Sequence, residues 1–194
     1  MRKAWQWKTL LFLFVILIFL TSCSPRPVIN SDAAVNLQEK EPVLLPCLYY
    51  EENQFLKNQE KAETFPIKGK MLAAISPHHP PAMADTAAIL QSAKANDAFY
   101  DTIYIVGPNH SGESKYLLTS NASWQTPFGV ATADVEAIDA LLQDRNCLAR
   151  TDDTKLTEEW SVSTLIPYVH SAFPEARIVP VLLSKGTSTT QVQA

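Results

Sequence analysis

The sequence predicts an α/β domain with a largely parallel, mixed sheet flanked by helices. Two observations support this fold class. Short uninterrupted apolar runs, which are typical of strands buried on both faces of a sheet, recur along the chain. Segments with apolar residues at helical spacing lie between several of these runs, so strands and helices alternate. The runs expected to form strands are residues 71–76, 102–107, 116–120, 128–133 and 176–184.

Helices are expected between these strands. Asp134 is a suitable N-cap for one of them, and Pro167 is expected to kink another or to end its first part. The stretch NASWQTP (121–127) is expected to be a turn between two strands. The segments expected to form helices are residues 51–63, 83–97, 134–146 and 156–173.

The first 22 residues have the layout of a secretory signal. Arg2, Lys3 and Lys8 precede an uncharged apolar run, TLLFLFVILIFL (9–20). This run is about a dozen residues long, whereas a helix that spans a bilayer needs roughly 20 apolar residues. A cationic start followed by a short apolar core is typical of a cleaved signal peptide. We therefore predict a signal peptide over residues 1–22.

The residues that follow this run predict a lipid anchor. LTSC (20–23) resembles the bacterial lipobox, in which signal peptidase cuts before the cysteine and the cysteine is acylated. Cys23 would then attach the protein to a membrane, and residues 23–42, which are polar and contain prolines, would form a tether. In the alternative interpretation the signal is an ordinary one and Cys23 only lies near the cleavage site. The expected location is the bacterial cell envelope, outside the cytoplasm.

Charge and length narrow the class of protein further. The net charge is −4, and it becomes −7 without residues 1–22, because that segment carries three basic and no acidic residues. A nucleic-acid surface needs a basic footprint, so no nucleic-acid partner is expected. Residues 43–194 are long enough for one domain with a core. Cys47 and Cys147 could pair outside the cytoplasm, but two cysteines do not predict a disulfide.

Three of the four histidines follow two predicted strands at the same point of a shared pattern. His78 and His79 lie in AAISPHHPPAMAD, and His110 lies in IYIVGPNHSG. The strand, helix and strand over residues 71–107 form a βαβ unit, so the two strands should be parallel. Ligands bind beyond the carboxyl ends of parallel strands. We therefore expect histidines from both loops to meet in one crevice.

These two loops have a metal-site interpretation and a simpler one. Two imidazoles that converge from separate loops are typical transition-metal ligands, and an added carboxylate would suit non-haem iron. Adjacent residues of a strand point to opposite faces, so only one of His78 and His79 is expected to face His110. In the simpler interpretation the histidines are ordinary polar loop residues, and the prolines beside them explain why the two loops look alike.

Four segments of the chain, taken in order, resemble the Memo family, which is known in bacteria and archaea as protein B of the AmmeMemoRadiSam system. They are ISPHHPP, IVGPNHSG, WQTPFGVATAD and EEWSVSTLIPYVHSAFPEARIVPVLL, and their order and spacing agree with the family over residues 42–184. The family's hallmarks there are Pro-His, Gly-Pro-(Ser/Asn)-His, Trp-x-Thr-Pro-x-Gly and Glu-His-Ser-(Ile/Val). The resemblance implies a fold related to the class III extradiol dioxygenases, whose members hold non-haem iron(II) at the strand ends.

The resemblance also implies roles for particular residues. His78 and His110 match two metal ligands of the family, with His79 as an alternative ligand. Iron(II) is the implied metal, and copper or another divalent transition metal is the alternative. Core packing for Trp124 and a special backbone angle for Gly129 are simpler interpretations of those two residues. The residues that match motifs lining the family's site are Asn109, Trp124, Thr126, Pro127 and Gly129.

The chain departs from the family pattern in three places. His79-Pro80-Pro81 stands where the family usually has a small residue, a glycine and an aromatic residue. Trp160 replaces the histidine of Glu-His-Ser, which removes an imidazole able to handle protons. The family domain also continues beyond the strand at residues 176–184 and supplies its third metal ligand there. We therefore expect the domain to be incomplete at the C-terminus and to lack that ligand.

The sequence leaves two functions open. The first is a metal-binding protein, for which dioxygenase-like oxidoreductase chemistry is implied by the resemblance alone. Glu158 or Glu159 could then supply a carboxylate ligand, although a solvated position at a helix start explains either residue as well. The second is a non-enzymatic envelope protein that binds a small molecule or a partner in the crevice. Trp160 favours the second function, whereas His78 and His110 favour the first. The sequence predicts no catalytic residue, substrate or oligomeric state.

Overall fold

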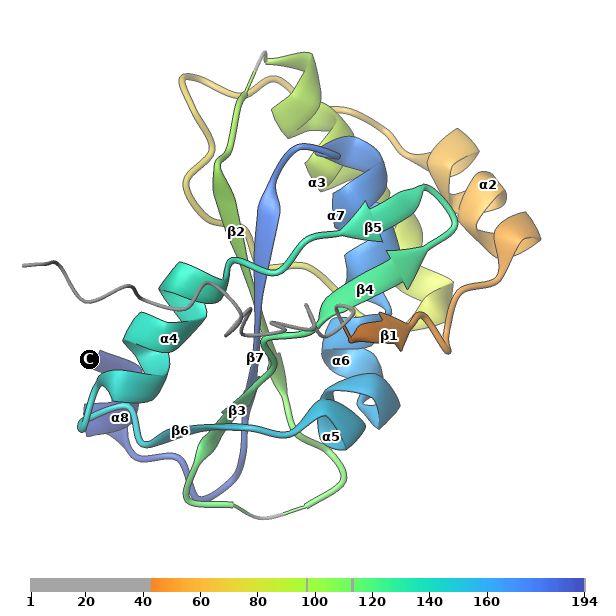
Figure 1. The fold of residues 1–194 in the computed structure, drawn as a ribbon. Helices are drawn as coiled ribbons and strands as arrows, with labels where there is room; N and C mark the ends of the chain where they lie inside the picture. The colour runs from red at the N-terminus through yellow and green to blue at the C-terminus, as the bar shows by residue number, and fades with distance from the viewer. Residues whose placement is uncertain (1–42, 97, 113, 194) are drawn as a thin grey trace, which may run out of the picture. The chain divides into compact units, whose positions relative to one another are not determined.

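The structure, a computed structural model, describes residues 43–96, 98–112 and 114–193. The predicted signal peptide, the tether and Cys23 lie outside the described residues. Among the residues that are described, no helix is both long enough and apolar enough to cross a bilayer. Strands and helices of this part of the chain form a mixed α/β fold, as predicted (Figure 1).

The described strands are β1 (Leu44–Pro46), β2 (Thr102–Pro108), β3 (Leu117–Thr119), β4 (Ser123–Thr126), β5 (Gly129–Ala131), β6 (Ala149–Thr151) and β7 (Arg177–Leu183). They form two mixed sheets, where the sequence predicted one. The larger sheet has the order β2-β7-β3-β6, with β2 parallel to β7, β3 parallel to β6, and β3 antiparallel to β7. The smaller sheet has the order β1-β4-β5, with β1 parallel and β5 antiparallel to β4.

The described helices are α2 (Glu52–Lys61), the 3-10 helix η1 (Pro80–Ala82), α3 (Met83–Ala95), α4 (Val135–Gln143), α5 (Asp153–Glu158), α6 (Trp160–Ser163), α7 (Leu165–Ala172) and α8 (Thr189–Gln193). Three of them, α6, α7 and α4, cover the two faces of β7, the second strand of the larger sheet. Ile178 and Leu182 pack in one core cluster with residues of α6 and α7, whereas Val179 and Val181 pack with Ile138 of α4. Figure 1 shows α3 and α7 on one side of β2 and β7 and α4 on the other.

Most predicted elements are confirmed. β2, β3, β5 and β7 coincide with four of the predicted strands, and α2, α3 and α4 fall within predicted helices. The expected turn at residues 121–127 is wrong, because this stretch contains β4, which pairs with both β1 and β5. The strand β6 was not predicted, and its three residues are too few for a pattern of alternation to stand out.

The prediction of a buried strand at residues 71–76 is wrong. This segment has no assigned strand, Leu72 is 89% exposed and Ile75 is 99% exposed. β2 pairs with β7 instead, so the predicted βαβ unit is present only as α3 and β2. The physical reason is that an apolar run becomes a strand only where a neighbour offers backbone donors and acceptors. Residues 71–76 make no backbone–backbone hydrogen bond to any other described residue.

The single helix expected at residues 156–173 is three helices, α5, α6 and α7. One break falls at Glu159, whose extended backbone (φ −84°, ψ 113°) ends α5 and begins α6. The other falls at Thr164, after α6 ends at Ser163. Pro167 has no N–H for the carbonyl of Ser163, four residues before it, so this break agrees with the prediction that Pro167 ends a first part of the helix. Pro167 lies in the first turn of α7, where a missing backbone N–H leaves no helical hydrogen bond unmade.

Asp134 is the N-cap of α4, as predicted, and it also ties this helix to the sheet. Its buried carboxylate accepts the backbone N–H of Ala137 at 3.2 Å, and it accepts the hydroxyl of Thr102. It also pairs with Arg177 Nη1 at 3.2 Å. The hydrogen bond from Thr102 is the main cause that lowers the pKa of Asp134, with Ala137 and Arg177 acting in the same direction and burial opposing them.

We predict that Asp134→Asn lowers the free energy of unfolding by about 1–3 kcal/mol at pH 7, because a buried charged acceptor is lost. Folding lowers the pKa of Asp134, so its charge stabilises the domain above the unfolded-state pKa of about 3.9. That contribution disappears as the pH falls through the lower, folded-state pKa. Urea unfolding should therefore show a smaller difference between variant and wild type at pH 3 than at pH 7. An equal difference at both pH values would contradict a role for the charge.

Candidate functional site

Three histidines and one tryptophan come together where β2 ends. The ring centroids of His78 and His110 are 5.4 Å apart, and those of His78 and His79 are 4.7 Å apart. Trp160, the first residue of α6, packs against all three imidazoles, with centroid distances of 5.4, 4.5 and 5.2 Å to His78, His79 and His110. The structure thus brings the histidines of both loops around one indole ring.

His110 reaches this position because the chain stays attached to β7 after β2 ends. The backbone N–H of Asn109 donates to the carbonyl of Leu183 at 2.8 Å. The buried side chain of Asn109 donates to Ser184 Oγ at 3.0 Å and accepts the backbone N–H of Ser111 at 3.2 Å. Asn109 therefore fixes the turn that presents His110 at the end of the sheet.

His78 and His79 arrive from the segment before η1. Thr86 of α3 holds this segment by donating to the carbonyl of Pro77 at 2.9 Å. The two imidazoles stack at an interplanar angle of 26°, and His78 is the one that packs against His110. Opposite directions for His78 and His79 were expected from a strand, and they are not observed because these residues do not form one.

Glu159 joins α6 to the loop after β2. Its side chain is only 1% exposed, and its Oε1 lies 2.8 Å from His110 Nδ1. Its Oε2 accepts the backbone N–H of His110 at 2.7 Å, and Oε1 also accepts that of Ser161 at 3.1 Å. The sequence suggested either a direct ligand or a solvated residue, and the structure shows instead a buried acceptor for His110. One feature of the sequence could have indicated this role: Glu159 is a carboxylate at the start of a helix, and it directly precedes the position where the family has histidine.

The surroundings of this site favour an ionised Glu159 and a neutral His78. Burial acts to raise the pKa of Glu159, but the hydrogen bonds from the His110 ring and from the backbone of Ser161 and His110 outweigh it and lower the pKa. Burial lowers the pKa of His78 from 6.5, and the neighbouring His79 and His110 lower it further, against the opposing charge of Glu159. A neutral imidazole is the form that binds a metal.

The ring nitrogens fit part of a transition-metal site. Nε2 of His78 is buried and has no hydrogen-bond partner among the described residues. Nδ1 of His110 is occupied by Glu159, which leaves Nε2 of that ring as its ligand atom. Within residues 43–193, apart from the two internal residues that the structure does not describe, no three His, Cys, Asp or Glu side chains are placed to hold one ion. Two imidazole nitrogens are thus available as metal ligands, and other groups would fill the remaining coordination positions of the ion.

Gly107 allows α6 to approach the end of β2. A β-carbon at this position would lie 2.6 Å from Ser161 Oγ and 3.0 Å from Val162 Cγ2. The hydroxyl of Ser161 donates to the carbonyl of Pro108 at 2.7 Å, which holds the two segments together. Glu159 and Trp160 are the two residues before Ser161, so the contact between Ser161 and β2 sets the distance of both residues from His110.

The residues of the Trp-x-Thr-Pro-x-Gly motif lie in β4, in β5 and in the turn between them. Trp124 is fully buried in the main core cluster, and its Nε1 has no hydrogen-bond partner among the described residues. Thr126 Oγ1 lies 2.7 Å from Nδ1 of the buried His170 and donates to the carbonyl of Gly129 at 3.0 Å. Pro127 is exposed within this turn, and Gly129 has a φ of +119°. The motif residues therefore pack in the core or form a turn.

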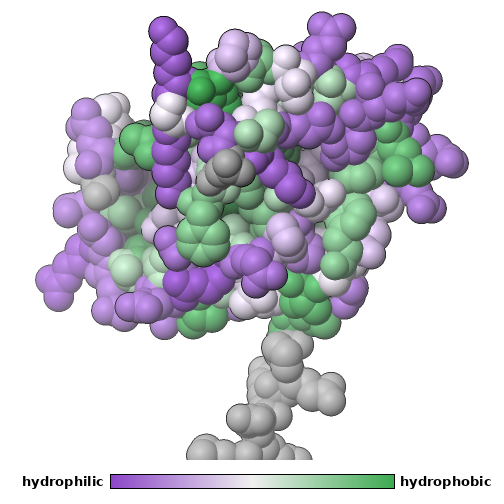
Figure 2. Space-filling model, turned by 90° about the horizontal axis from the view of Figure 1, so that it is seen from above, coloured by the Kyte–Doolittle hydropathy of each residue, from purple (hydrophilic) through white to green (hydrophobic). Residues whose placement is uncertain are grey.

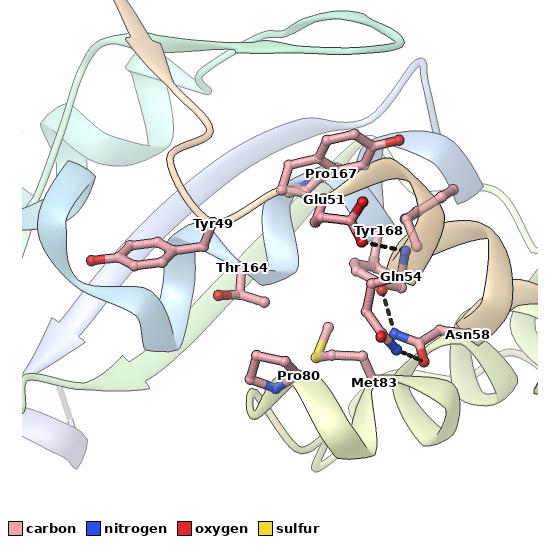
Figure 3. A pocket seen from close by; sticks show the side chains of 11 residues that line it. Tyr49, Glu51, Gln54, Asn58, Pro80, Met83, Thr164, Pro167 and Tyr168 are labelled. Carbon is pink, nitrogen blue, oxygen red and sulfur yellow. Dashed lines mark hydrogen bonds between the residues drawn. The ribbon is translucent and has the colours of Figure 1, made fainter.

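A separate small cavity lies between α2, the start of α3 and α7 (Figure 3). Its volume is about 110 Å³, whereas pockets for small organic ligands usually have about 300–1,000 Å³. Inside it, Gln54 donates to Asn58 Oδ1 at 2.9 Å, and Asn58 donates to the hydroxyl of Tyr168 at 2.9 Å. No histidine lines it, although Pro80 on its wall directly follows His79. The cavity offers room for a few water molecules.

Fold and site together define an α/β protein that gathers histidines beyond the carboxyl ends of its strands. The profile of a family described as Memo-like protein matches residues 48–194. The chain therefore belongs to the Memo family, as its four motifs predicted.

Similar proteins carry the same family name. The chain is 27% identical over 131 residues to a MEMO1 family protein of Archaeoglobus fulgidus, covering 67% of this chain and 48% of the relative. It is 28% identical over 126 residues to one of Pyrobaculum aerophilum, covering 64% of this chain and 44% of the relative. For one of Thermotoga neapolitana, the identity is 31% over 88 residues, covering 45% of this chain and 31% of the relative. The matches thus extend over about half or less of each relative.

We predict that Gly107→Ala destabilises the domain by about 1–3 kcal/mol, because the new methyl group would push α6 away from β2. Gly112→Ala is a matched control, since no atom lies within 4 Å of the position of its β-carbon. Urea unfolding of both variants measures the effect. Equal unfolding midpoints for Gly107→Ala and wild type would show that the contact between β2 and α6 is looser than described.

Proposed function

We propose that this Memo-family chain binds a divalent transition metal through His78 and His110, with His79 as an alternative ligand. The observation that carries the proposal is the buried, unpartnered Nε2 of His78, which lies beside an oriented His110 ring. A buried polar nitrogen without a partner destabilises a protein by about 1–3 kcal/mol. A metal ion bound to this nitrogen would satisfy it.

Glu159 supports the proposal because it selects the tautomer of His110. An ionised carboxylate accepts hydrogen bonds only, so the proton of a neutral His110 ring lies on Nδ1, which faces Glu159. The lone pair of that ring is then on Nε2. A carboxylate that holds the second nitrogen of a metal-bound imidazole is a common feature of metal sites, and it raises the basicity of the ligand.

The residues around the two ligands would hold and shield the ion. His78 and His110 would supply its imidazole ligands, and Trp160 would cover them with an apolar ring. A divalent transition metal bound here would supply Lewis-acid chemistry, or redox chemistry if it is iron or copper. Imidazole ligands suit iron, copper, zinc and nickel alike, so the resemblance alone favours iron(II).

A second function, binding of a small molecule or partner without a metal, is favoured by Trp160. The indole occupies the place of a family histidine and fills the space beside all three imidazoles. His79 is exposed, stacks on His78 and contacts Trp160 edge to face, so a flat ligand could pack against the same aromatic surface. In this function the fold would be kept without a metal centre.

We predict that the full chain, purified without an affinity tag and incubated with Fe(II), Co(II) or Cu(II), retains metal after desalting. His78→Ala and His110→Ala should retain little of it, because each removes one of two imidazole ligands. Glu159→Gln should weaken binding by about 10–100-fold, because the orientation of His110 is lost. Metal content is measured by mass spectrometry, and affinity by the quenching of Trp160 fluorescence, with Trp160→Phe as the optical blank.

His170→Gln is the matched control for these variants, since it replaces the one histidine that lies outside the cluster and keeps a partner for Thr126. It should bind metal as the wild type does. Equal metal content in the wild type, His78→Ala and His110→Ala would exclude the metal site and leave the metal-free function.

We further propose that the protein is exported and anchored in the bacterial envelope by a lipid on Cys23. The support is in the sequence, where a cationic start, a short apolar run and LTSC follow one another. Residues 24–42 would then separate the domain from the membrane surface.

We predict that Cys23→Ala abolishes metabolic labelling with palmitate and leaves the signal peptide uncleaved. Cys47→Ala is the matched control, because it removes a cysteine of the domain and should leave labelling unchanged. Unchanged labelling of Cys23→Ala would exclude the lipid anchor, and normal cleavage without labelling would indicate an ordinary secretory signal.

A further inference from the structure

The smaller sheet has one buried face and one exposed face. In the register of β1, β4 and β5, Leu45 lies beside Trp124 and Trp124 beside Ala131, and all three side chains are buried. Side chains alternate between the two faces of a sheet, so the neighbouring positions point outward. The outward-facing residues of the three strands are Leu44, Pro46, Ser123, Gln125 and Val130.

The three strands of this sheet and their flanking loops carry no charge. Residues 43–50 and 121–132 include no Asp, Glu, Lys, Arg or His, although 19% of the whole chain is charged. Because β1 is parallel and β5 antiparallel to β4, Leu48 after β1 and Phe128 before β5 extend beyond the same end of the sheet. With these two residues, the uncharged face consists of Leu44, Pro46, Leu48, Gln125, Phe128 and Val130. Its four large apolar side chains are between 41% and 57% exposed.

The end of the molecule at which β2 begins has a different surface. In Figure 2, which views this end, hydrophobic residues lie between hydrophilic ones. The exposed Phe99, for example, has the exposed Lys94 and Asp101 close to it in the sequence. Single apolar residues among charged ones are ordinary on a protein surface, whereas a contiguous apolar patch indicates contact with a partner or a membrane.

The predicted tether leads directly into the uncharged face. β1 begins at Leu44, one residue after the first described residue, and residues 24–42 would connect Val43 to the acylated Cys23. A flexible linker of this length has an end-to-end distance of roughly 25 Å, from about 5–6 Å times the square root of its residue number. The smaller sheet, where the tether attaches, would therefore stay close to the bilayer.

We propose that the uncharged face docks on the lipid bilayer to which the chain is anchored. Its large apolar side chains would enter the boundary between the headgroups and the acyl chains. The Gln125 amide donates to the carbonyl of Thr126 at 3.1 Å, which reduces the cost of removing it from water. This inference rests on the proposed lipid anchor and does not depend on the metal site.

The charge of the chain explains why this face, and not another, would meet the bilayer. Without residues 1–22 the net charge is −7, so anionic lipids repel most of the surface. An uncharged face avoids both this repulsion and the cost of desolvating a charge. Binding to a membrane interface increases with the apolar area buried. The anchor also raises the local concentration of bilayer, so a patch of a few side chains is sufficient.

Docking would fix which side of the domain faces the membrane. The buried face of the smaller sheet packs in one core cluster with Val162 of α6 and Ile166 of α7. The sheet would therefore lie between the bilayer and these two helices. The histidines packed against Trp160, at the start of α6, would then be held at a fixed distance from the membrane.

The test couples residues 23–194 through Cys23 to vesicles of phosphatidylethanolamine and phosphatidylglycerol that contain a maleimide lipid. Burial raises the pKa of Cys47 to about 12 and also raises that of Cys147, so Cys23 is the thiol that reacts. The reference is the same chain coupled to a soluble polyethylene glycol maleimide. Hydroxyl-radical labelling, read by mass spectrometry, measures the exposure of individual side chains in both samples.

Labelling of Leu48 and Phe128 should fall by at least about threefold on vesicles, because inserted side chains lose contact with water. Labelling of Phe99 and Val192, which are both 62% exposed and lie outside the uncharged face, should stay the same. These two residues serve as internal controls for general shielding by the vesicle surface.

Two charged variants locate the docking surface. Val130→Glu places a charge on the exposed face of β5, and Leu48→Glu places one in the turn after β1, where no strand pairing is disturbed. Both should return the labelling of Phe128 on vesicles to the level of the soluble sample. Val135→Glu is the matched control, at a residue of α4 that is 47% exposed, and should not. Urea unfolding midpoints show whether each variant keeps the fold.

The proposal would be overturned by unchanged labelling of Leu48 and Phe128 on vesicles, or by an equal fall at Phe99 and Val192. A fall in the soluble sample that grows with protein concentration would make a second copy of the chain the occupant. Coupling through Cys23 needs no natural lipid, so this result is independent of the palmitate labelling that tests the anchor.

Discussion

The buried carboxylate of Glu159 is the interaction on which the rest of the site depends. It lies between two helices, accepts N–H groups from both His110 and Ser161, and is almost completely shielded from water. A buried charge is unfavourable unless hydrogen bonds surround it. Here the surrounding donors come from the loop after β2 and from the start of α6. Any arrangement that moved these two segments apart would leave the charge without partners.

This constraint connects the sheet to the chemistry of the site. Pairing of β2 with β7 fixes the loop, Glu159 fixes the imidazole at the end of that loop, and Trp160 follows as the next residue of the chain. The close approach at Gly107 lets these contacts exist together. A residue that would be solvated on an ordinary helix start is therefore part of the support of His110.

The sequence predicts well those features that depend on local pattern. β2 and β7 are long, apolar and rich in β-branched residues, and both form where expected. Asp134 caps its helix because an N-cap is a local preference. Residues 71–76 have the same apolar pattern as β2, but pattern reports a preference for burial and does not report whether a pairing partner is present. The meeting of His78 and His110 was expected, although the strand that was to position His78 does not form.

The parts of the site that could not be predicted are contacts between distant segments. Glu159 bonds to a residue 49 positions earlier in the chain, and no periodicity carries that information. The packing of Trp160 on three imidazoles likewise needs the break between α5 and α6, which comes from the backbone of a single residue. Motif comparison marked position 160 as unusual, but only the three-dimensional contacts show what the indole does there.

The place of β7 in the chain has a consequence for how the protein folds during synthesis. β7 is among the last described elements, yet it lies inside the larger sheet and contributes residues to two core clusters, one on each of its faces. A ribosome that has released everything up to residue 170 has produced β2 and α4 without the strand against which they pack. The larger sheet therefore cannot assemble before β7 has emerged from the ribosome.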